Sequence, residues 1–257
     1  MQLAIELARR AGGLILEGQK SSLQVSRKGP TDLVTDYDLR SEQMLVKSIR
    51  EAYPEDHIIA EEGTSSRAAS TEAEHLWLID PIDGTTNYAH GIPFYSVSIG
   101  LMVKEHLVFG VVYDPSRDEL FHASEGGGAW LGDQPLQVSE TRTLEDSLLV
   151  TGFPYDIRTN PNNNLNHFNR FALSTRAVRR LGSAALDLAY VAAGRFDGYW
   201  ELRLNAWDWA AGVLLTQEAG GVVTTFTGND KALDGDETLL ATNGHLHQAM
   251  MTSLGQS

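Results

Sequence analysis

The chain has 257 residues, with 34 acidic and 20 basic side chains and a formal net charge of −14. This length allows one large domain or two closely packed lobes, and the acidity argues against direct binding to nucleic acid and would repel an anionic substrate unless cations intervene. Cysteine is absent, which excludes disulfides, thiolate metal sites and cysteine nucleophiles and favours a reducing cytoplasm. We expect neither a signal peptide nor a membrane span.

The first part of the chain predicts a helical scaffold and a polar turn. Apolar residues at helical spacing predict a helix over residues 3–17. The segment 27–32 is polar and turn-forming, and its cations Arg27 and Lys28 are candidates for offsetting phosphate charge. Taken alone, either cation is more often a solvated loop residue.

A second helix is predicted from Asp36 to Ala52. Asp38 lies in its first turn, where a carboxylate is commonly a cap or a partner of the helix dipole. An outer role at a metal site is the alternative for Asp38, and the local sequence leaves both interpretations open.

Two short apolar strands each end in acidic residues. The strand at 57–60 runs into Glu61, and the strand at 76–79 runs into Asp80. A buried carboxylate is untenable unless it is paired or metal-bound. If the two strands are neighbours in one sheet, Glu61 and Asp80 emerge at a common edge and can share a cation. The polar stretch 64–74 between the strands is expected to be a mobile loop.

The segment after Asp80 combines carboxylates with a predicted helix start. Pro81 has no amide hydrogen, so we expect it to end the strand and to turn Asp83 towards Asp80. The residues 84–86 form a flexible corner and a helix start, whose backbone N–H groups suit a phosphate. The alternative is an ordinary surface turn, but such a turn gains nothing from following a fully apolar strand.

Short strands follow up to residue 131, with a hairpin predicted at the glycines 126–128. The second half alternates helices and strands, and Ser183 is expected to cap a helix. A strand at 198–201 closes on Glu201. Asp208 stands between two tryptophans in the first turn of another helix, and this apolar setting favours a ligand over a dipole partner.

These motifs together resemble the inositol monophosphatase family of magnesium-dependent, lithium-sensitive phosphatases. The resemblance covers nearly the whole chain and is most specific at Trp77–Tyr88, Trp207–Gly212 and Glu218–Gly221. It implies a layered α-β-α-β-α sandwich of the α/β (α+β) class, shared with fructose-1,6-bisphosphatase. It also implies one domain over 1–257, with an N-terminal lobe of about 1–145 and a C-terminal lobe of about 146–257, usually assembled as a homodimer.

The resemblance also assigns site residues by position. Those implied as metal ligands are Glu61, Asp80, Ile82 through its carbonyl, Asp83 and Asp208, with Asp38 near a weaker cation. Those implied as substrate contacts are Ile82, Asp83, Gly84, Thr85 and Asp208 around the phosphate, and Arg179 and Glu201 beside the alcohol. Glu61, Thr85 and Asp83 would be catalytic.

The chemistry that fits these residues is hydrolysis of a phosphate monoester by metal-activated water. Carboxylates and a carbonyl, without His or Cys, suit roughly two or three magnesium ions. Thr85 is expected to position the water. The resemblance favours inositol 1-phosphate or a similar polyol monophosphate as the substrate, because the nucleotidase-like and histidinol-phosphatase-like branches tend to have a lysine at the position of Thr86. Fructose 1,6-bisphosphate and 3′-phosphonucleotides remain alternatives.

Two further points stay open. Arg203 stands where relatives often have glycine, so an extra cation either reaches the pocket or leans away into solvent. A different class of function is a metal-stabilised dimeric interaction protein that kept the fold and lost turnover. The intact set of acidic residues argues against that alternative.

Overall fold

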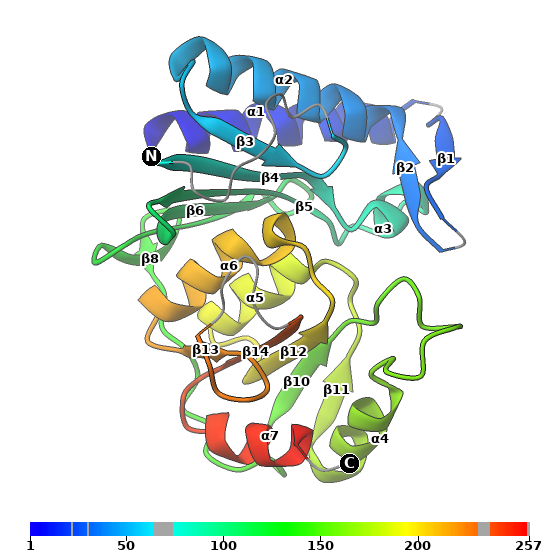
Figure 1. Cartoon of the computed structure of the whole chain (residues 1–257), viewed down its shortest axis with the longest axis vertical. Coiled ribbons are helices and arrows are strands. Elements are labelled where there is room, and N and C mark those ends of the chain that lie inside the picture. Colours follow the sequence, from blue (N-terminus) through cyan, green and yellow to red (C-terminus); the bar gives the residue numbers. More distant parts are fainter. Residues whose placement is uncertain (22, 30, 64–73, 231–236, 256–257) are drawn as a thin grey trace.

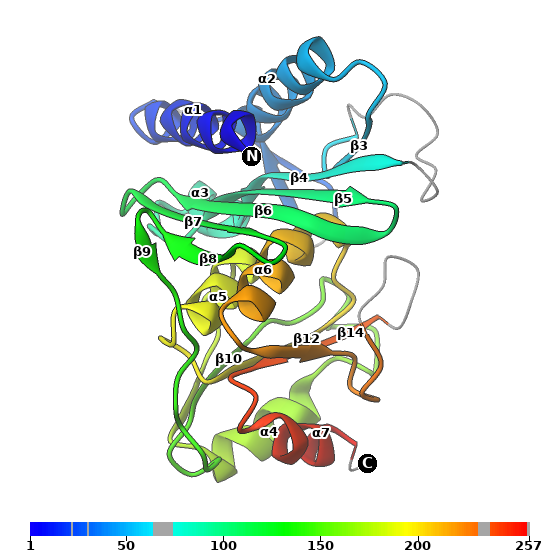
Figure 2. The ribbon, with the colours of Figure 1, turned by 90° about the vertical axis from the view of Figure 1, so that its left-hand side faces the viewer.

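The computed structural model describes residues 1–21, 23–29, 31–63, 74–230 and 237–255. The loop expected at 64–74 lies outside these residues, apart from Glu74. Figures 1 and 2 show two sheets stacked with helices above, between and below them. The predicted α-β-α-β-α sandwich is therefore confirmed.

The upper sheet has seven strands and is covered on its outer face by two helices. These helices are α1 (Gln2–Gln19) and α2 (Asp36–Ala52). The strands, in spatial order, are β3 (His57–Ala60), β4 (His75–Asp83), β5 (Ser96–Val103), β6 (His106–Asp114), β7 (Glu119–Ser124), β8 (Gly128–Leu131) and β9 (Gln134–Pro135). Only β3 and β4 pair in parallel. Beside this sheet lie the hairpin β1 (Val25–Arg27) and β2 (Leu33–Thr35) and the short helix α3 (Thr85–Ala89).

The lower sheet has five strands and faces two central helices. In spatial order its strands are β11 (Ala177–Arg179), β10 (Leu148–Thr151), β12 (Gly198–Leu202), β14 (Thr238–Thr242) and β13 (Val222–Thr224). The central helices are α5 (Ala184–Ala192) and α6 (Ala206–Glu218), and the outer ones are α4 (Leu165–Ser174) and α7 (His247–Leu254). The lobe boundary near residue 145 stays a prediction.

The central helices are apolar on nearly every side because both of their faces are covered. Eight of the nine residues of α5 are buried, and so are the eight residues from Trp209 to Thr216 in α6. A helix between two sheets has no broad solvent face, so it lacks the polar stripe of a surface helix. By contrast, α1 and α2 bury one stripe each against the upper sheet.

The prediction that Pro81 ends its strand is wrong. Strand β4 continues through Pro81 to Asp83, and its register with β5 shifts between Asp80 and Asp83. A β-bulge accommodates a residue that has no N–H to donate. Because the strand continues, Asp83 lies opposite Ser96 of β5 and close to the start of α5.

Within the described part of the chain, we find no helix that combines the length and the apolar character needed to cross a membrane.

Candidate active site

A cleft opens between the end of β4, the start of α3 and the lower sheet. Of the residues assigned from the sequence, those that line it are Glu61, Asp80, Ile82, Asp83, Gly84, Thr85, Glu201 and Asp208. Two assigned residues, Asp38 and Arg179, do not line it. The cleft thus brings together segments more than 140 positions apart in the chain.

Glu61 enters the cleft from β3 and already has a cationic partner. Strands β3 and β4 are neighbours, which is the condition on which the shared edge was expected, and they run in parallel with Ala60 opposite Ile79, so Glu61 follows at the same edge as Asp80. The Lys28 ammonium lies 2.9 Å from a Glu61 oxygen and 2.5 Å from a Glu62 oxygen. Lys28 therefore pairs with a carboxylate that lines the cleft and is not simply a solvated loop residue.

The pKa values of Asp80 and Asp208 are both raised by burial and by neighbouring charges. Burial raises the pKa of Asp80 well above its usual range, and the charges of Glu61, Asp83 and Asp208 raise it further. Burial, followed by the charges of Asp83 and Glu61, likewise raises the pKa of Asp208. The Asp208 carboxylate accepts the Asn205 N–H at 2.7 Å, which caps α6. The cleft therefore gathers negative charge that its own cations do not balance.

Asp83 is held by the first turn of α5. Its Oδ2 accepts the Ser183 hydroxyl at 2.5 Å and the Ala185 N–H at 2.7 Å, and its Oδ1 accepts the Ala184 N–H at 3.2 Å. Burial raises the pKa of Asp83 to about 6, although these donors oppose the shift. The prediction that Ser183 caps its helix is confirmed, since its side chain also accepts the Leu186 N–H. Its contact with Asp83 was not predicted.

Thr85 and Asp38 form a buried pair beside the cleft. The Thr85 hydroxyl lies 2.9 Å from Asp38 Oδ1 and 3.0 Å from the Ile82 carbonyl, so its one proton chooses between two acceptors. Asp38 Oδ2 accepts the backbone N–H and the hydroxyl of Thr35, as in a capping box. Burial raises the pKa of Asp38 to about 6. Asp38 therefore accepts a hydrogen bond from Thr85 and also caps the start of α2.

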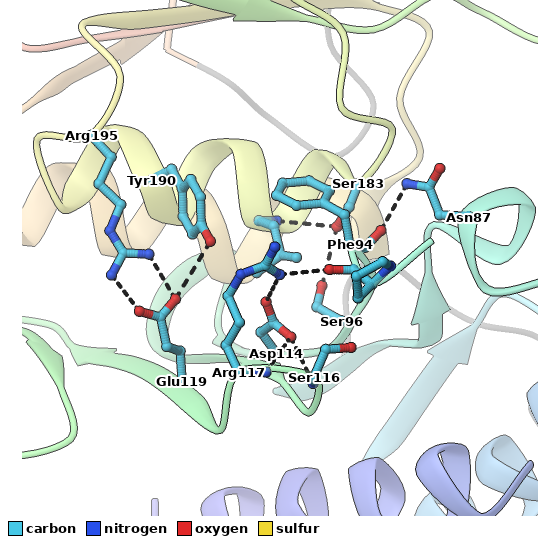
Figure 3. A network of polar contacts seen from close by, with 12 residues as sticks. Asn87, Phe94, Ser96, Asp114, Ser116, Arg117, Glu119, Ser183, Tyr190 and Arg195 are labelled. Atoms are coloured by element: carbon cyan, nitrogen blue, oxygen red, sulfur yellow. Dashed lines mark hydrogen bonds and ion pairs between the residues drawn. The ribbon is translucent and has the colours of Figure 1, made fainter. Parts of the chain in front are cut away.

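A polar network behind the cleft fixes α5 at both ends (Figure 3). Asn87 of α3 donates to the carbonyls of Phe94 at 2.7 Å and Leu181 at 2.8 Å, and so ties the upper sheet to the segment before α5. At the other end, Glu119 of β7 accepts hydrogen bonds from Arg195 and, at 3.5 Å, from Tyr190. No local sequence signal predicts this network, because its members lie far apart in the chain.

Glu201 and Arg180 also line the cleft. Burial raises the pKa of Glu201 to about 7, and the Tyr199 hydroxyl donates to it at 2.5 Å. Gly152 leaves room for this carboxylate, since a Cβ there would lie 2.1 Å from both Glu201 oxygens. The exposed Arg179 guanidinium donates to the Val178 carbonyl at 3.2 Å, whereas Arg180 lines the cleft.

The donor set fits a hard divalent cation in chemistry. In the ranges that the structure describes, no three acidic or histidine side chains already gather closely enough to hold a metal ion. The carboxylates have other partners instead: Glu61 contacts Lys28, Asp83 contacts α5 and Asp208 contacts Asn205. All the donors are nevertheless oxygens, which magnesium prefers, and their mutual repulsion is relieved by added positive charge.

The whole chain, residues 1–257, matches the inositol monophosphatase family. An inositol-1-monophosphatase of Synechocystis sp. is 42% identical over 99% of this chain and 88% of its own length. The Nus factor SuhB of Pseudomonas aeruginosa is 43% identical over 99% of this chain and 95% of its own length.

A solved structure supports the same relationship. The inositol monophosphatase from Anabaena superposes with a TM-score of 0.87 and is 41% identical, covering 99% of this chain and 94% of its own. The sequence and the fold therefore agree over essentially the full length. This chain belongs to the inositol monophosphatase family of phosphatases.

Proposed function

We propose that this protein is a magnesium-dependent phosphatase that hydrolyses inositol 1-phosphate or a closely related polyol monophosphate. One observation carries the proposal: acidic side chains from three distant segments line the same cleft as Thr85 and the start of α3. The relative of Synechocystis named inositol-1-monophosphatase supports the choice of substrate. Phosphate esters hydrolyse extremely slowly without help, so the site must neutralise charge and supply an activated water.

Five groups would hold the magnesium ions: the carboxylates of Glu61, Asp80, Asp83 and Asp208, and the Ile82 carbonyl. When bound, magnesium would neutralise the phosphoryl oxygens and make the attacking water more acidic. Glu61 must exchange its contact with Lys28 for the cation. We propose that Lys28, once released, remains close enough to offset phosphate charge.

Thr85 would orient the attacking water. When its hydroxyl donates to Asp38, its oxygen lone pairs are free to accept a hydrogen bond from that water. Asp38 then acts by holding Thr85, and we prefer this role to that of a ligand for a third cation. The backbone N–H groups of Gly84 and Thr85, at the start of α3, would bind the phosphate.

Glu201 would face the alcohol part of the substrate, with Arg180 beside it. We propose Arg180 in place of Arg179, because Arg180 lines the cleft and Arg179 does not. A carboxylate and a guanidinium on one wall suit an alcohol that carries several hydroxyl groups, since each accepts or donates hydrogen bonds to them.

The test is release of inorganic phosphate from myo-inositol 1-phosphate with magnesium and with EDTA, and with added lithium. Fructose 1,6-bisphosphate and 3′-phosphoadenosine 5′-phosphate are run in parallel. We expect magnesium-dependent, lithium-inhibited release, fastest from inositol 1-phosphate. Faster release from either parallel ester would change the substrate, and no release from any ester would contradict the proposal.

A second role is favoured by one comparison. The Pseudomonas relative named Nus factor SuhB is about as similar as the phosphatase of Synechocystis, so an interaction role is a second candidate. We also propose that the chain forms a homodimer, which sedimentation would show. A folded, dimeric chain that releases no phosphate from all three esters would favour the interaction role.

A further inference from the structure

Arg203 occupies a backbone conformation that favours glycine. It follows Leu202 at the end of β12, with φ at +57°, in the left-handed region where a side chain is disfavoured. Its N–H donates to the Glu237 carbonyl at 2.7 Å, so the turn is well fixed. A side chain at this position imposes a backbone cost, which its contacts must offset.

The Arg203 guanidinium leans towards the loop that connects β10 to α4, residues 152–164. One of its terminal nitrogens lies 2.9 Å from Asp156 Oδ1 and 2.6 Å from the Asn162 carbonyl. The side chain is 19% exposed, and no acceptor among the described residues reaches its buried Nε. Asp156 thus neutralises Arg203, and Arg203 is itself among the residues that line the cleft, so this cation reaches the pocket and does not lean away into solvent.

The same loop forms one wall of the cleft. Phe153, Pro154 and Tyr155 line it, and they follow Gly152, which lies against the Glu201 carboxylate. The loop is fastened at its base by Asn164, which donates to the Gly152 carbonyl at 2.6 Å. From the β1–β2 hairpin, the Thr31 hydroxyl donates to the Tyr155 carbonyl at 2.8 Å.

Arg203 contacts this loop mainly through the Asp156 carboxylate. Asn160 donates to the second Asp156 oxygen at 2.8 Å, so the carboxylate links Arg203 to the far limb of the loop. The contact with Asn162 reaches that limb directly. Arg203 therefore joins both limbs of the loop to the end of β12, one residue after Leu202 and two after Glu201.

On the basis of the proposed function, we propose that Arg203 is a positioning residue that holds the wall formed by residues 153–155 against the alcohol part of the substrate. The wall contains neither Thr85 nor any of the candidate metal ligands, and it follows Gly152 beside the Glu201 carboxylate, so we expect it to affect which alcohol fits and not the attack on phosphorus. An arginine suits this role better than a lysine, because its planar guanidinium can donate hydrogen bonds to several acceptors in a fixed geometry.

The test uses two variants that break the contact from opposite ends. R203G removes the side chain and relieves the backbone conformation, whereas D156N removes the charge without altering the turn. For both, we expect KM for inositol 1-phosphate to rise about five- to tenfold, with kcat and the KM for p-nitrophenyl phosphate nearly unchanged. The double variant should be no worse than either single one, and R203K should recover part of the loss.

Arg176→Ala is the matched control. It removes another arginine of the same half of the chain, whose 3.1 Å ion pair with Asp146 lies outside the cleft lining. It should leave the ratio of the two KM values unchanged. Amide hydrogen exchange over residues 153–162 should become faster in R203G and D156N but not in R176A.

The outcomes separate this proposal from the function on which it rests. Wild-type protein that hydrolyses no ester overturns both. Active wild-type protein with unchanged KM values in R203G and D156N overturns the role of Arg203 alone, and so does a parallel fall in kcat for both esters.

Discussion

The Ser183 hydroxyl at the start of α5 lies 2.5 Å from Asp83 Oδ2 at the end of β4. This contact joins residues 100 positions apart and connects the upper sheet to a central helix. It also gives Asp83 two roles, because a candidate magnesium ligand serves as a helix cap. Substitutions at this carboxylate must therefore be judged for stability and for turnover separately.

We expect Asp83→Asn to lower phosphate release by about a thousandfold at saturating magnesium, because it removes a charged ligand. The asparagine oxygen still accepts one hydrogen bond, and loss of the charge relieves repulsion from Asp80 and Asp208. The free energy of unfolding should consequently change by less than about 2 kcal/mol. Phosphate release and urea unfolding measure the two effects.

Asp118→Asn is the control for this substitution. Asp118 is an exposed carboxylate that pairs with Arg9 outside the cleft lining, so its loss should leave turnover unaltered. Normal magnesium-dependent turnover in Asp83→Asn would contradict the assignment of this ligand.

Replacing Thr85 by Val should reduce kcat and leave KM nearly unchanged. Valine keeps the shape of the side chain but removes the hydroxyl that contacts Asp38, and we expect a loss of about 10²- to 10⁴-fold. Thr85→Ser retains the hydroxyl and should keep most of the activity. Steady-state kinetics with inositol 1-phosphate decide the matter, and an equal loss in the serine variant would point to packing instead of the hydroxyl.

Gly152→Ala should destabilise the protein through Glu201. The new methyl group would lie 2.1 Å from the carboxylate oxygens, and overpacking of this kind costs about 1–3 kcal/mol. Glu201→Ala should also destabilise, since it leaves the Tyr199 hydroxyl without its acceptor. In the double variant the clash is gone, so its cost should be smaller than the sum of the two.

Urea unfolding of the four proteins in this cycle provides the measurement. Additive costs, within about 0.5 kcal/mol, would show that the two residues do not interact. Gly13→Ala is a useful reference because the new methyl group meets nothing within 4 Å, and a helical alanine is favoured over glycine.

Asp187 should make stability depend on pH. Burial raises its pKa well above the usual range, and its Oδ1 has no hydrogen-bond partner among the described residues. A raised folded-state pKa stabilises the protein fully below the unfolded pKa of 3.8, and that contribution is lost as pH rises towards the folded value. Asp187→Asn stays neutral and should gain stability relative to wild type by up to about 1.4 kcal/mol per pH unit.

Urea unfolding of wild type and Asp187→Asn at pH 5, 6, 7 and 8 measures this difference directly. Because each pair of measurements shares the same pH, the titration of other groups largely cancels. A difference that stays constant over this range would show that Asp187 binds the same number of protons in the folded and unfolded states, and it would contradict this prediction.

Several elements were predictable because their signals are local. The helical spacing of α1, the capping signal of α2 and the apolar strand β5 each lie within fewer than 20 residues. The shared edge of β3 and β4 was also predictable, because two apolar strands close in sequence each end in acid. By contrast, α7 gave no strong periodic pattern and was not predicted.

The sequence by itself determined the types of side chain at the site: oxygen donors, a threonine hydroxyl and a helix start. Only the tertiary structure decided their partners. In the folded chain Asp83 accepts hydrogen bonds from the start of α5, Asp38 accepts one from Thr85, and Arg203 donates one to Asp156. Arg180 lines the cleft, whereas Arg179 does not. The reason is physical: local spacing sets which way a backbone segment folds, whereas the partner of a buried charge depends on what distant segments bring within a few ångströms of it.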